Sequence, residues 1–319
     1  MKHPVSIIGL GVMGQRMLTN MHKYAGFAPV VAWDPDEGAC RRTAEQYPRL
    51  EIAADAAAAI EHPATRVVYI ASPPRSHEAH ALAAIAAGKA VYCEKPLGVD
   101  VAASRRMTET AEASAAVDIV NFSLASAAAT TEIERRLARG EAGELAGVDI
   151  RLHFSQWPRA WQMDAAGWLS RRAEGGFTRE VLSHWIYLTQ RLFGALTLHR
   201  ASARYPGGDA AETHLVARLE ADGLPVSVAG SVGGSGPDLV EYTIWGSRTS
   251  LRVFDWNRLF SSTGGEWQAE LTHIADAREA GYELQLAHAA RAVAGETHTM
   301  PGFADALAVQ VLIEAMLET

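Results

Sequence analysis

A glycine-rich segment near the start of the chain, residues 9–14 with the sequence GLGVMG, limits what the chain can fold into. An apolar, β-branched run at residues 5–8 precedes it and predicts a short strand. A segment predicted to be helical starts at residue 15, and a second apolar run at residues 29–33 leads to Asp34. Strand, glycine turn, helix and strand in this order make a βαβ unit with a G-x-G-x-x-G turn, which predicts a doubly wound parallel sheet.

The three glycines of this turn have separate physical tasks. Gly9 permits the tight turn, Gly11 lets backbone N–H groups approach a pyrophosphate, and Gly14 lets the helix pack closely. The start of the helix adds unpaired N–H donors and a partial positive charge. Asp34 follows Gly14 by 20 residues and can accept a hydrogen bond from a ribose 2′-hydroxyl, which favours NAD over NADP. Three glycines can also form an ordinary turn, but the flanking elements favour a nucleotide site.

Length, charge and cysteine content narrow the class of protein. The 319 residues are enough for two domains, and the net charge of -8 without clustered Lys and Arg argues against a nucleic-acid partner. Cys40 and Cys93 show no metal-binding or C-x-x-C spacing, so we expect no metal site and a reduced, cytoplasmic setting. No apolar stretch reaches the roughly 18–20 residues of a membrane span, and we expect no signal peptide and no membrane partner.

Two further apolar runs end in motifs that carry chemistry. Residues 66–71 are apolar without alternation, which is typical of parallel strands covered on both faces, and they lead into Ser72 and Pro73. Cofactors bind at the carboxyl ends of parallel strands, so Ser72, Pro73 and the following His77 are candidate cofactor-binding residues. Residues 90–93 predict the next strand, which leads into Glu94 and Lys95.

Lys95 is the candidate acid/base residue. It follows a strand of the predicted sheet, so we expect it to point into the crevice of the nucleotide, and Pro96 restricts it to extended conformations. Beside a nicotinamide and away from water, its pKa should fall below the usual value of about 10.4, which would suit proton exchange with a substrate oxygen. The alternative interpretation is a surface lysine paired with Glu94.

In order and spacing, these motifs resemble those of the Gfo/Idh/MocA oxidoreductase family. The resemblance rests on residues 9–14, 71–77 and 87–97 and covers about the first 120 residues. It implies an α/β Rossmann domain (residues 1–121), followed by an α+β domain with a large open antiparallel sheet for substrate binding and oligomerisation (residues 122–319). It also implies NAD(P)-dependent hydride transfer with Lys95 as catalytic acid/base. The expected cofactor-binding residues are Gly9, Gly11, Val12, Met13, Gly14, Asp34, Ser72, Pro73, His77, Glu94 and Lys95.

A second motif, residues 174–184, resembles the Gly-Gly…Asp-x-x-x-His helix of the same family. By this resemblance His184 takes the second catalytic position, as a proton relay or a hydrogen-bond partner of the substrate. Glu180 and His184 are four residues apart and share one face of a helix, so the carboxylate would orient the imidazole and favour its charged form. Glu180 stands where the family usually has Asp, and Tyr187 where a further Asp is common. The alternatives are an ordinary surface pair and, less favoured without a further ligand, a zinc site.

The substrate-binding residues depart from the family pattern, which suggests an unusual substrate. Asn121 lies where members often have an Asn-x-Arg stretch, but no arginine follows it. Four tryptophans (Trp157, Trp161, Trp168 and Trp185) occur among four arginines (Arg159, Arg171, Arg172 and Arg179). They could form an aromatic, cationic wall for an anionic or aromatic substrate, or tryptophan core with arginine stems packed past it. The expected substrate-binding residues are Glu180, Asn121, Trp161, Arg179 and Tyr187.

The rest of the chain predicts an antiparallel meander and two helices. Alternating runs at residues 197–204, 213–219, 226–231, 239–245 and 250–254, separated by turn residues, predict strands with one polar face. Open sheets of this kind often pack against a second subunit, so we expect a homodimer or homotetramer. Residues 282–293 and 303–317 predict helices, the last with one apolar stripe.

The sequence therefore predicts a cytoplasmic oxidoreductase that uses NAD, with NADP as the alternative. A hydride would move between the nicotinamide and a CH–OH carbon of a sugar, a polyol or a related small molecule. Two other functions are considered: a dehydrogenase or reductase of a carboxylated lactol or cyclic imine, and a non-catalytic nucleotide sensor. A sensor could lose Lys95 and His184, and both residues are present here.

Overall fold

The computed structural model describes residues 2–318 and divides into two compact units. The first unit comprises the chain up to Ala125 together with Tyr282–Gln310, and the second comprises Ser126–Gly281 and the chain from Val311 on. In the described part of the chain, no helix combines the length and apolarity needed to cross a membrane.

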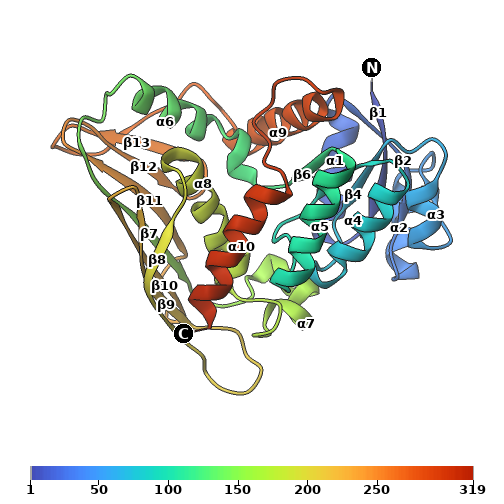
Figure 1. The fold of residues 1–319 in the computed structure, drawn as a ribbon, viewed down its shortest axis with the longest axis horizontal. Helices are drawn as coiled ribbons and strands as arrows, with labels where there is room; N and C mark the ends of the chain where they lie inside the picture. Colours follow the sequence, from blue (N-terminus) through green and yellow to red (C-terminus); the bar gives the residue numbers. More distant parts are fainter. Residues whose placement is uncertain (1, 319) are drawn as a thin grey trace. The chain divides into compact units, whose positions relative to one another are not determined.

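The first unit contains a six-stranded parallel sheet in the order β3-β2-β1-β4-β5-β6 (Figure 1). This is the predicted Rossmann arrangement. Every residue of β4, Val67–Ile70, is buried, which agrees with the lack of alternation in its sequence. The other strands are β1 His3–Ile8, β2 Phe27–Trp33, β3 Glu51–Ile52, β5 Ala90–Cys93 and β6 Asp118–Val120. The helices are α1 Val12–Lys23, α2 Glu37–Gln46, α3 Ala56–Glu61, α4 His77–Ala86 and α5 Val101–Ser114.

Helix α9, Ala277–Ala294, contributes most of its length to the first unit. A Cβ on Gly26, which precedes β2, would lie 3.0 Å from Cβ of Ala290 on this helix. The backbone N–H of Val120 in β6 donates to the carbonyl of Pro301 at 2.9 Å. The predicted division assigned everything after residue 121 to the second domain. The helix buries Leu286, Ala289 and Val293, and no local pattern in the sequence tells which core they join.

The second unit contains an eight-stranded, mostly antiparallel sheet in the order β14-β13-β12-β11-β7-β10-β9-β8. The predicted alternation is confirmed: β9, His214–Ala221, has buried residues at every second position. The expectation of a simple meander was wrong, because β7, Leu145–Phe154, lies between β11 and β10 and runs parallel to β10. The other strands are β8 Thr197–Arg204, β10 Leu224–Val232, β11 Leu239–Gly246, β12 Ser250–Phe254, β13 Arg258–Ser262 and β14 Gln268–Ala269. The last two were not predicted.

Helix α8, Ser183–Phe193, is anchored to the sheet by aromatic side chains. The indole of Trp185 is fully buried and stacks on the ring of Tyr242 in β11, with ring centroids 5.5 Å apart. Gly230 in β10 leaves room for Phe177, since a Cβ there would lie 2.3 Å from Cε2 of that ring. The remaining helices are α6 Ala128–Ala138, α7 Ala166–Leu169 and α10 Phe303–Leu317. The structure therefore places the helix that carries His184 on a rigid aromatic core.

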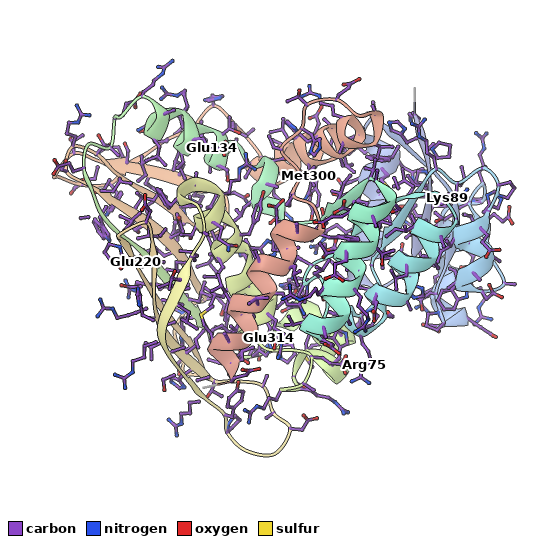
Figure 2. The ribbon with its side chains drawn as sticks, viewed as in Figure 1. Arg75, Lys89, Glu134, Glu220, Met300 and Glu314 are labelled. Atoms are coloured by element: carbon purple, nitrogen blue, oxygen red, sulfur yellow. The ribbon has the colours of Figure 1, made fainter. Side chains whose placement is uncertain are left out.

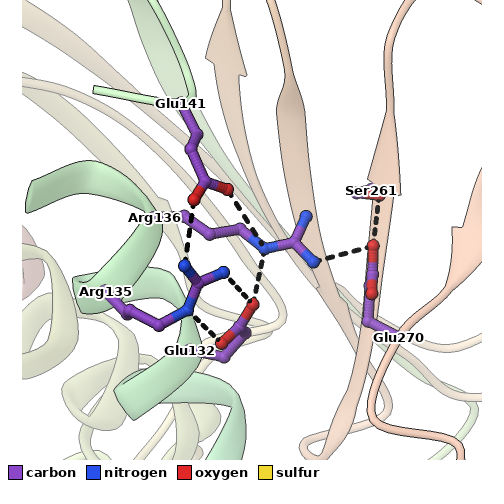
Figure 3. A network of polar contacts seen from close by, with 6 residues as sticks. All are labelled: Glu132, Arg135, Arg136, Glu141, Ser261 and Glu270. Atoms are coloured by element: carbon purple, nitrogen blue, oxygen red, sulfur yellow. Dashed lines mark hydrogen bonds and ion pairs between the residues drawn. The ribbon is translucent and has the colours of Figure 1, made fainter. Parts of the chain in front are cut away.

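An ion-pair network joins α6 to the far end of the same sheet (Figure 3). Glu132 pairs with Arg135 and with Arg136, each at 2.7 Å, and Arg136 continues to Glu270 at 2.9 Å. The hydroxyl of Ser261 in β13 donates to Glu270 at 2.6 Å. Hydrogen bonds from Arg135 and Arg136 hold the pKa of the Glu132 carboxyl at about 2. The network thus connects α6 to β13 and to the segment that follows β14.

Candidate active site

The glycine-rich turn has the geometry of a phosphate cradle. Gly9 has a φ of +100°, and a Cβ on it would lie 2.6 Å from the carbonyl carbon of Ala71. A Cβ on Gly14 would lie 2.0 Å from the oxygen of Gly9. At Gly11, by contrast, a Cβ would meet no atom within 4 Å. Helix α1 starts directly after Gly11 with no side-chain cap and no acidic residue in its first turn, so its N-terminal N–H groups suit a pyrophosphate.

Asp34 lies at the end of β2 and is tied to this turn. Its carboxylate accepts the backbone N–H of Leu10 at 2.6 Å and that of Asp36 at 2.8 Å. The N–H of Gly9 donates to the carbonyl of Trp33 at 2.8 Å, which holds the turn beside the strand end. A carboxylate has about four acceptor positions, so Asp34 retains capacity for ribose hydroxyls. The predicted position of Asp34 and the residues around it therefore fit an NAD molecule.

His77 joins the segments that follow β4 and β5. Its Nδ1 faces the carbonyl oxygens of Pro96 and Leu97 at 3.0 and 3.2 Å, and its Nε2 faces the carbonyl of Ser72 at 2.8 Å. The side chain is fully buried, and this burial lowers the pKa of the imidazole to about 4. His77 was predicted to bind the cofactor. Its contacts hold the backbone that follows β4 next to the backbone that follows β5.

Glu94 is the acceptor of a buried network. Tyr69 of β4 donates its hydroxyl to Glu94, and the amide of Asn121 donates to the same oxygen at 2.6 Å. Tyr92 of β5 donates to Oδ1 of Asn121 at 2.5 Å. Burial and the nearby Glu94 charge hold the pKa of both tyrosines well above 10, so they stay protonated donors. This network fixes the strand end from which Lys95, itself half-buried, continues the chain.

In the second unit, a buried carboxylate organises the Gly175-Gly176 turn. Glu212 accepts the backbone N–H of Thr178 at 2.8 Å, and a Cβ on Gly176 would lie 2.1 Å from the other Glu212 oxygen. Burial raises the pKa of this carboxyl. Only a glycine, with a φ of +100°, fits at position 176. Sequence reasoning missed Glu212 because it lies 34 residues beyond Thr178, with no local pattern to mark it.

Glu180 and His184 lie in a helix that is not α-helical throughout. Residues Thr178–Leu182 form a π-helical turn that leads into α8, so Glu180 lies in the π turn and His184 in the first turn of α8. Gln162 donates to the Glu180 carboxylate at 3.4 Å. His184 is 5 % exposed, and its imidazole lies edge-on to the ring of Trp256, with centroids 5.2 Å apart. Single π turns occur often at functional sites.

Arg179 and Tyr187, the remaining predicted substrate-binding residues, are both buried in the second unit. Arg179 is 7 % exposed and pairs at 2.6 Å with Glu314 of α10, which is labelled in Figure 2. Its Nη1 donates to the carbonyls of Arg172 and Gly175. Tyr187 is buried, and its hydroxyl accepts from Arg191 at 3.4 Å. These two side chains contribute to the packing of the second unit. Among the described residues, no group of three or more His, Cys, Asp or Glu is arranged to hold a metal.

Of the tryptophan and arginine cluster, one part is core and one part is exposed. Trp185 is fully buried, whereas Trp161 is 45 % exposed. The guanidinium of Arg159 lies 4.7 Å from the centre of the Trp161 ring, and its Nε donates to Gln162 at 2.9 Å. Trp185 is therefore core, and Trp161 with Arg159 forms an exposed aromatic and cationic pair.

The fold and the glycine turn define a protein with an NAD-binding Rossmann unit and a separate α+β unit. Residues 4–122 match the family model for the oxidoreductase family with an NAD-binding Rossmann fold, and residues 130–252 match the GFO/IDH/MocA C-terminal domain. The chain belongs to the Gfo/Idh/MocA family, as the sequence motifs predicted. The family match confirms the predicted fold and the prediction that NAD is the cofactor.

Curated relatives match about a third of the chain. The chain is 37% identical over 106 residues to inositol 2-dehydrogenase 4 of Saccharopolyspora erythraea, and 38% identical over 108 residues to inositol 2-dehydrogenase of Pseudomonas fluorescens. These matches cover 33% of this chain in both cases, and 31% and 32% of the relatives. The chain thus spans about a third of the length of the curated relatives it matches.

Solved structures match the whole fold. A levoglucosan dehydrogenase in complex with NADH and levoglucosan has a TM-score of 0.86 at 19% identity, covering 100% of this chain and 97% of that one. An oxidoreductase from Agrobacterium radiobacter, in complex with NAD+, L-tartaric acid and magnesium, has a TM-score of 0.84 at 18% identity, covering 100% and 96%. At these identities the likeness shows the fold alone.

Proposed function

We propose that the protein is an NAD-dependent dehydrogenase of a sugar, a polyol or a related small molecule that carries a CH–OH group. One observation supports this most directly. Lys95 follows β5, and β5 pairs in parallel with β4, whose end at Ala71 packs against Gly9 of the phosphate turn. The acid/base candidate and the cofactor turn therefore lie at the same edge of one sheet. The similarity to an inositol 2-dehydrogenase and to a levoglucosan dehydrogenase favours polyol and sugar substrates.

Lys95 is proposed to exchange the proton of the reaction. When bound, NAD supplies the acceptor or donor of the hydride. During oxidation, neutral Nζ of Lys95 takes the proton of the substrate hydroxyl, and during reduction the ammonium returns it to the carbonyl oxygen. Glu94, held by Tyr69 and Asn121, fixes the backbone from which Lys95 extends. Asn121 keeps one amide N–H and one lone pair for a substrate, beyond the bonds it makes in the network.

His184 is proposed to assist at the substrate oxygen, as its family motif implies. Gln162 holds the Glu180 carboxylate near the start of the same helix. Trp161, with Arg159 over its ring, offers an exposed aromatic and cationic surface in the second unit. That pair favours a second candidate substrate class, a carboxylated lactol or cyclic imine, because a guanidinium pairs well with a carboxylate.

We also propose a homodimer or homotetramer formed through the eight-stranded sheet. The outer face of this sheet carries a depression of about 470 Å³, lined by Arg151, Arg200 and Val216 among others. Val216, in the middle of β9, is 57% exposed. Sedimentation of the purified protein tests this proposal.

Both cysteines are free thiols, which supports the proposed cytoplasmic setting.

Turnover of a substrate panel tests the proposed activity. Sugars, polyols, hydroxy acids and cyclic imines are each tested with NAD(H) and NADP(H), followed by nicotinamide absorbance. Lys95→Met should abolish turnover while leaving NAD affinity, measured by calorimetry, within about twofold. Lys89→Met is a matched control: Lys89 (labelled in Figure 2) lies at the opposite end of β5, where its Nζ donates to the carbonyl of Thr65 at 2.7 Å. Full turnover in Lys95→Met would refute the proposed role of Lys95. No turnover of any substrate by the wild type, with NAD binding intact in the same samples, would favour a nucleotide sensor.

A further inference from the structure

A strained hairpin turn presents a tryptophan to His184. Strands β12 and β13 are joined by Asp255, Trp256 and Asn257, and Phe254 pairs with Arg258 across the turn. Asp255 has a φ of 49° and Trp256 a φ of 69°. A bulky side chain in the left-handed region is a genuine outlier, since glycine or asparagine occupies such turn positions at lower cost. Trp256 therefore occupies a backbone conformation that is unfavourable for its side chain.

The ring of Trp256 makes two specific contacts. Its centroid lies 5.2 Å from that of His184 with the ring planes at 87°, and 5.6 Å from that of Trp185 at 38°. Trp185 stacks in turn on Tyr242 of β11. Trp256 is only partly exposed, and it completes a row of aromatic rings from the core of the sheet to the imidazole. Strain of this kind persists where surrounding packing over-determines it, and it is concentrated at functional sites.

We propose that Trp256 is a positioning residue for His184: its ring sets the plane of the imidazole and closes one side of it to water. His184 is almost completely buried, so the indole removes one of the few directions in which the imidazole could turn. This inference rests on the catalytic role proposed for His184.

Replacing Trp256 by glycine separates positioning from folding. Trp256→Gly removes the ring and also relieves the left-handed backbone, so the turn itself should form more readily. Loss of the ring contact with Trp185 should lower the melting temperature, so kcat is measured well below the melting temperatures of both proteins. There it should fall by about 10- to 100-fold, the effect of a small misplacement of a reacting group. Trp256→Phe keeps an aromatic ring and should recover turnover to within about threefold. Asp255→Gly relieves strain at the neighbouring position without touching the ring and should leave turnover unchanged.

Imidazole NMR provides a readout that does not depend on turnover. The Hδ2 and Hε1 signals of His184, assigned by comparison with His184→Gln, should move in Trp256→Gly because the ring current of the indole is lost. Unmoved signals, or full kcat in Trp256→Gly, would overturn the proposed positioning role. Full turnover in His184→Gln would instead refute the catalytic role of His184, while the NMR shift would still report the contact. The two failures are therefore distinguishable.

Discussion

Lowering the pH should destabilise the protein through His77. Its imidazole is fully buried, and this burial lowers its pKa from 6.5 to about 4. The unfolded chain therefore binds a proton at His77 between pH 6.5 and 4, while the folded protein does not. The stability that depends on the neutral ring is fully present above pH 6.5 and is lost as the pH falls towards 4.

The size of the effect follows from the two pKa values. A difference of one pKa unit corresponds to about 1.4 kcal/mol, so a shift from 6.5 to about 4 amounts to about 3 kcal/mol in full. Between pH 7 and pH 5, the same linkage removes about 2 kcal/mol. Urea titrations of the wild type and of His77→Gln at both pH values measure this contribution, because every other titrating group is common to both proteins. The wild type should lose about 2 kcal/mol more than the variant.

His80→Gln, on the same helix α4, is the matched comparison. Burial also lowers the pKa of His80, but its side chain is only half-buried, so its removal should change the pH dependence less. Equal pH dependence in the wild type and His77→Gln would refute the argument. It would mean that the ring binds as many protons in the folded protein as in the unfolded chain. A wild type that loses less stability than His77→Gln would mean that the ring is charged in the folded protein and donates from both nitrogens to the carbonyls of Ser72 and Pro96.

Three further changes have directions that the structure sets. Gly14→Ala places a Cβ 2.0 Å from the oxygen of Gly9 and should weaken NAD binding by more than about tenfold in calorimetry; unchanged affinity would contradict the close packing. Asp34→Asn keeps a hydrogen-bond acceptor but removes the charge, so the NAD over NADP preference should shrink in fluorescence titrations, and an unaltered ratio would argue against a ribose contact. Glu132, whose pKa is held at about 2, stabilises the fold above about pH 4.5, and this contribution is lost as the pH falls towards 2. Glu132→Gln should flatten acid unfolding in that window by circular dichroism; the same acid transition in both proteins would show that the network of Figure 3 is energetically silent.

Much of the first unit could be predicted because its signals are local. The turn at residues 9–14 needs glycine at each position where the backbone closes, as the Gly9 and Gly14 contacts show. The strand β5 and the helix α10 begin and end where the apolar patterns predict. The position of Lys95 at a strand end also follows from the chain alone, because a buried apolar run must end where the sheet ends.

Contacts between distant residues could not be predicted in this way. Glu212 lies under Gly176, and Trp256 faces His184 from a hairpin 72 positions along the chain, yet no periodicity marks either residue. The burial of Arg179 against Glu314 is a contact of the same kind, between residues far apart in the sequence. A motif identifies a side chain's chemistry, whereas its partners depend on which elements the fold brings together.

The sequence by itself determined the βαβ start, the cofactor turn, the acid/base candidate and the alternation of the second sheet. Only the tertiary structure decided that β7 lies between β11 and β10, parallel to β10, and that most of α9 joins the first unit. The physical reason is that periodicity records how much of each residue is buried, and many pairings bury the same faces equally well. The choice among these pairings depends on how the whole unit packs, and no single stretch of sequence encodes that packing.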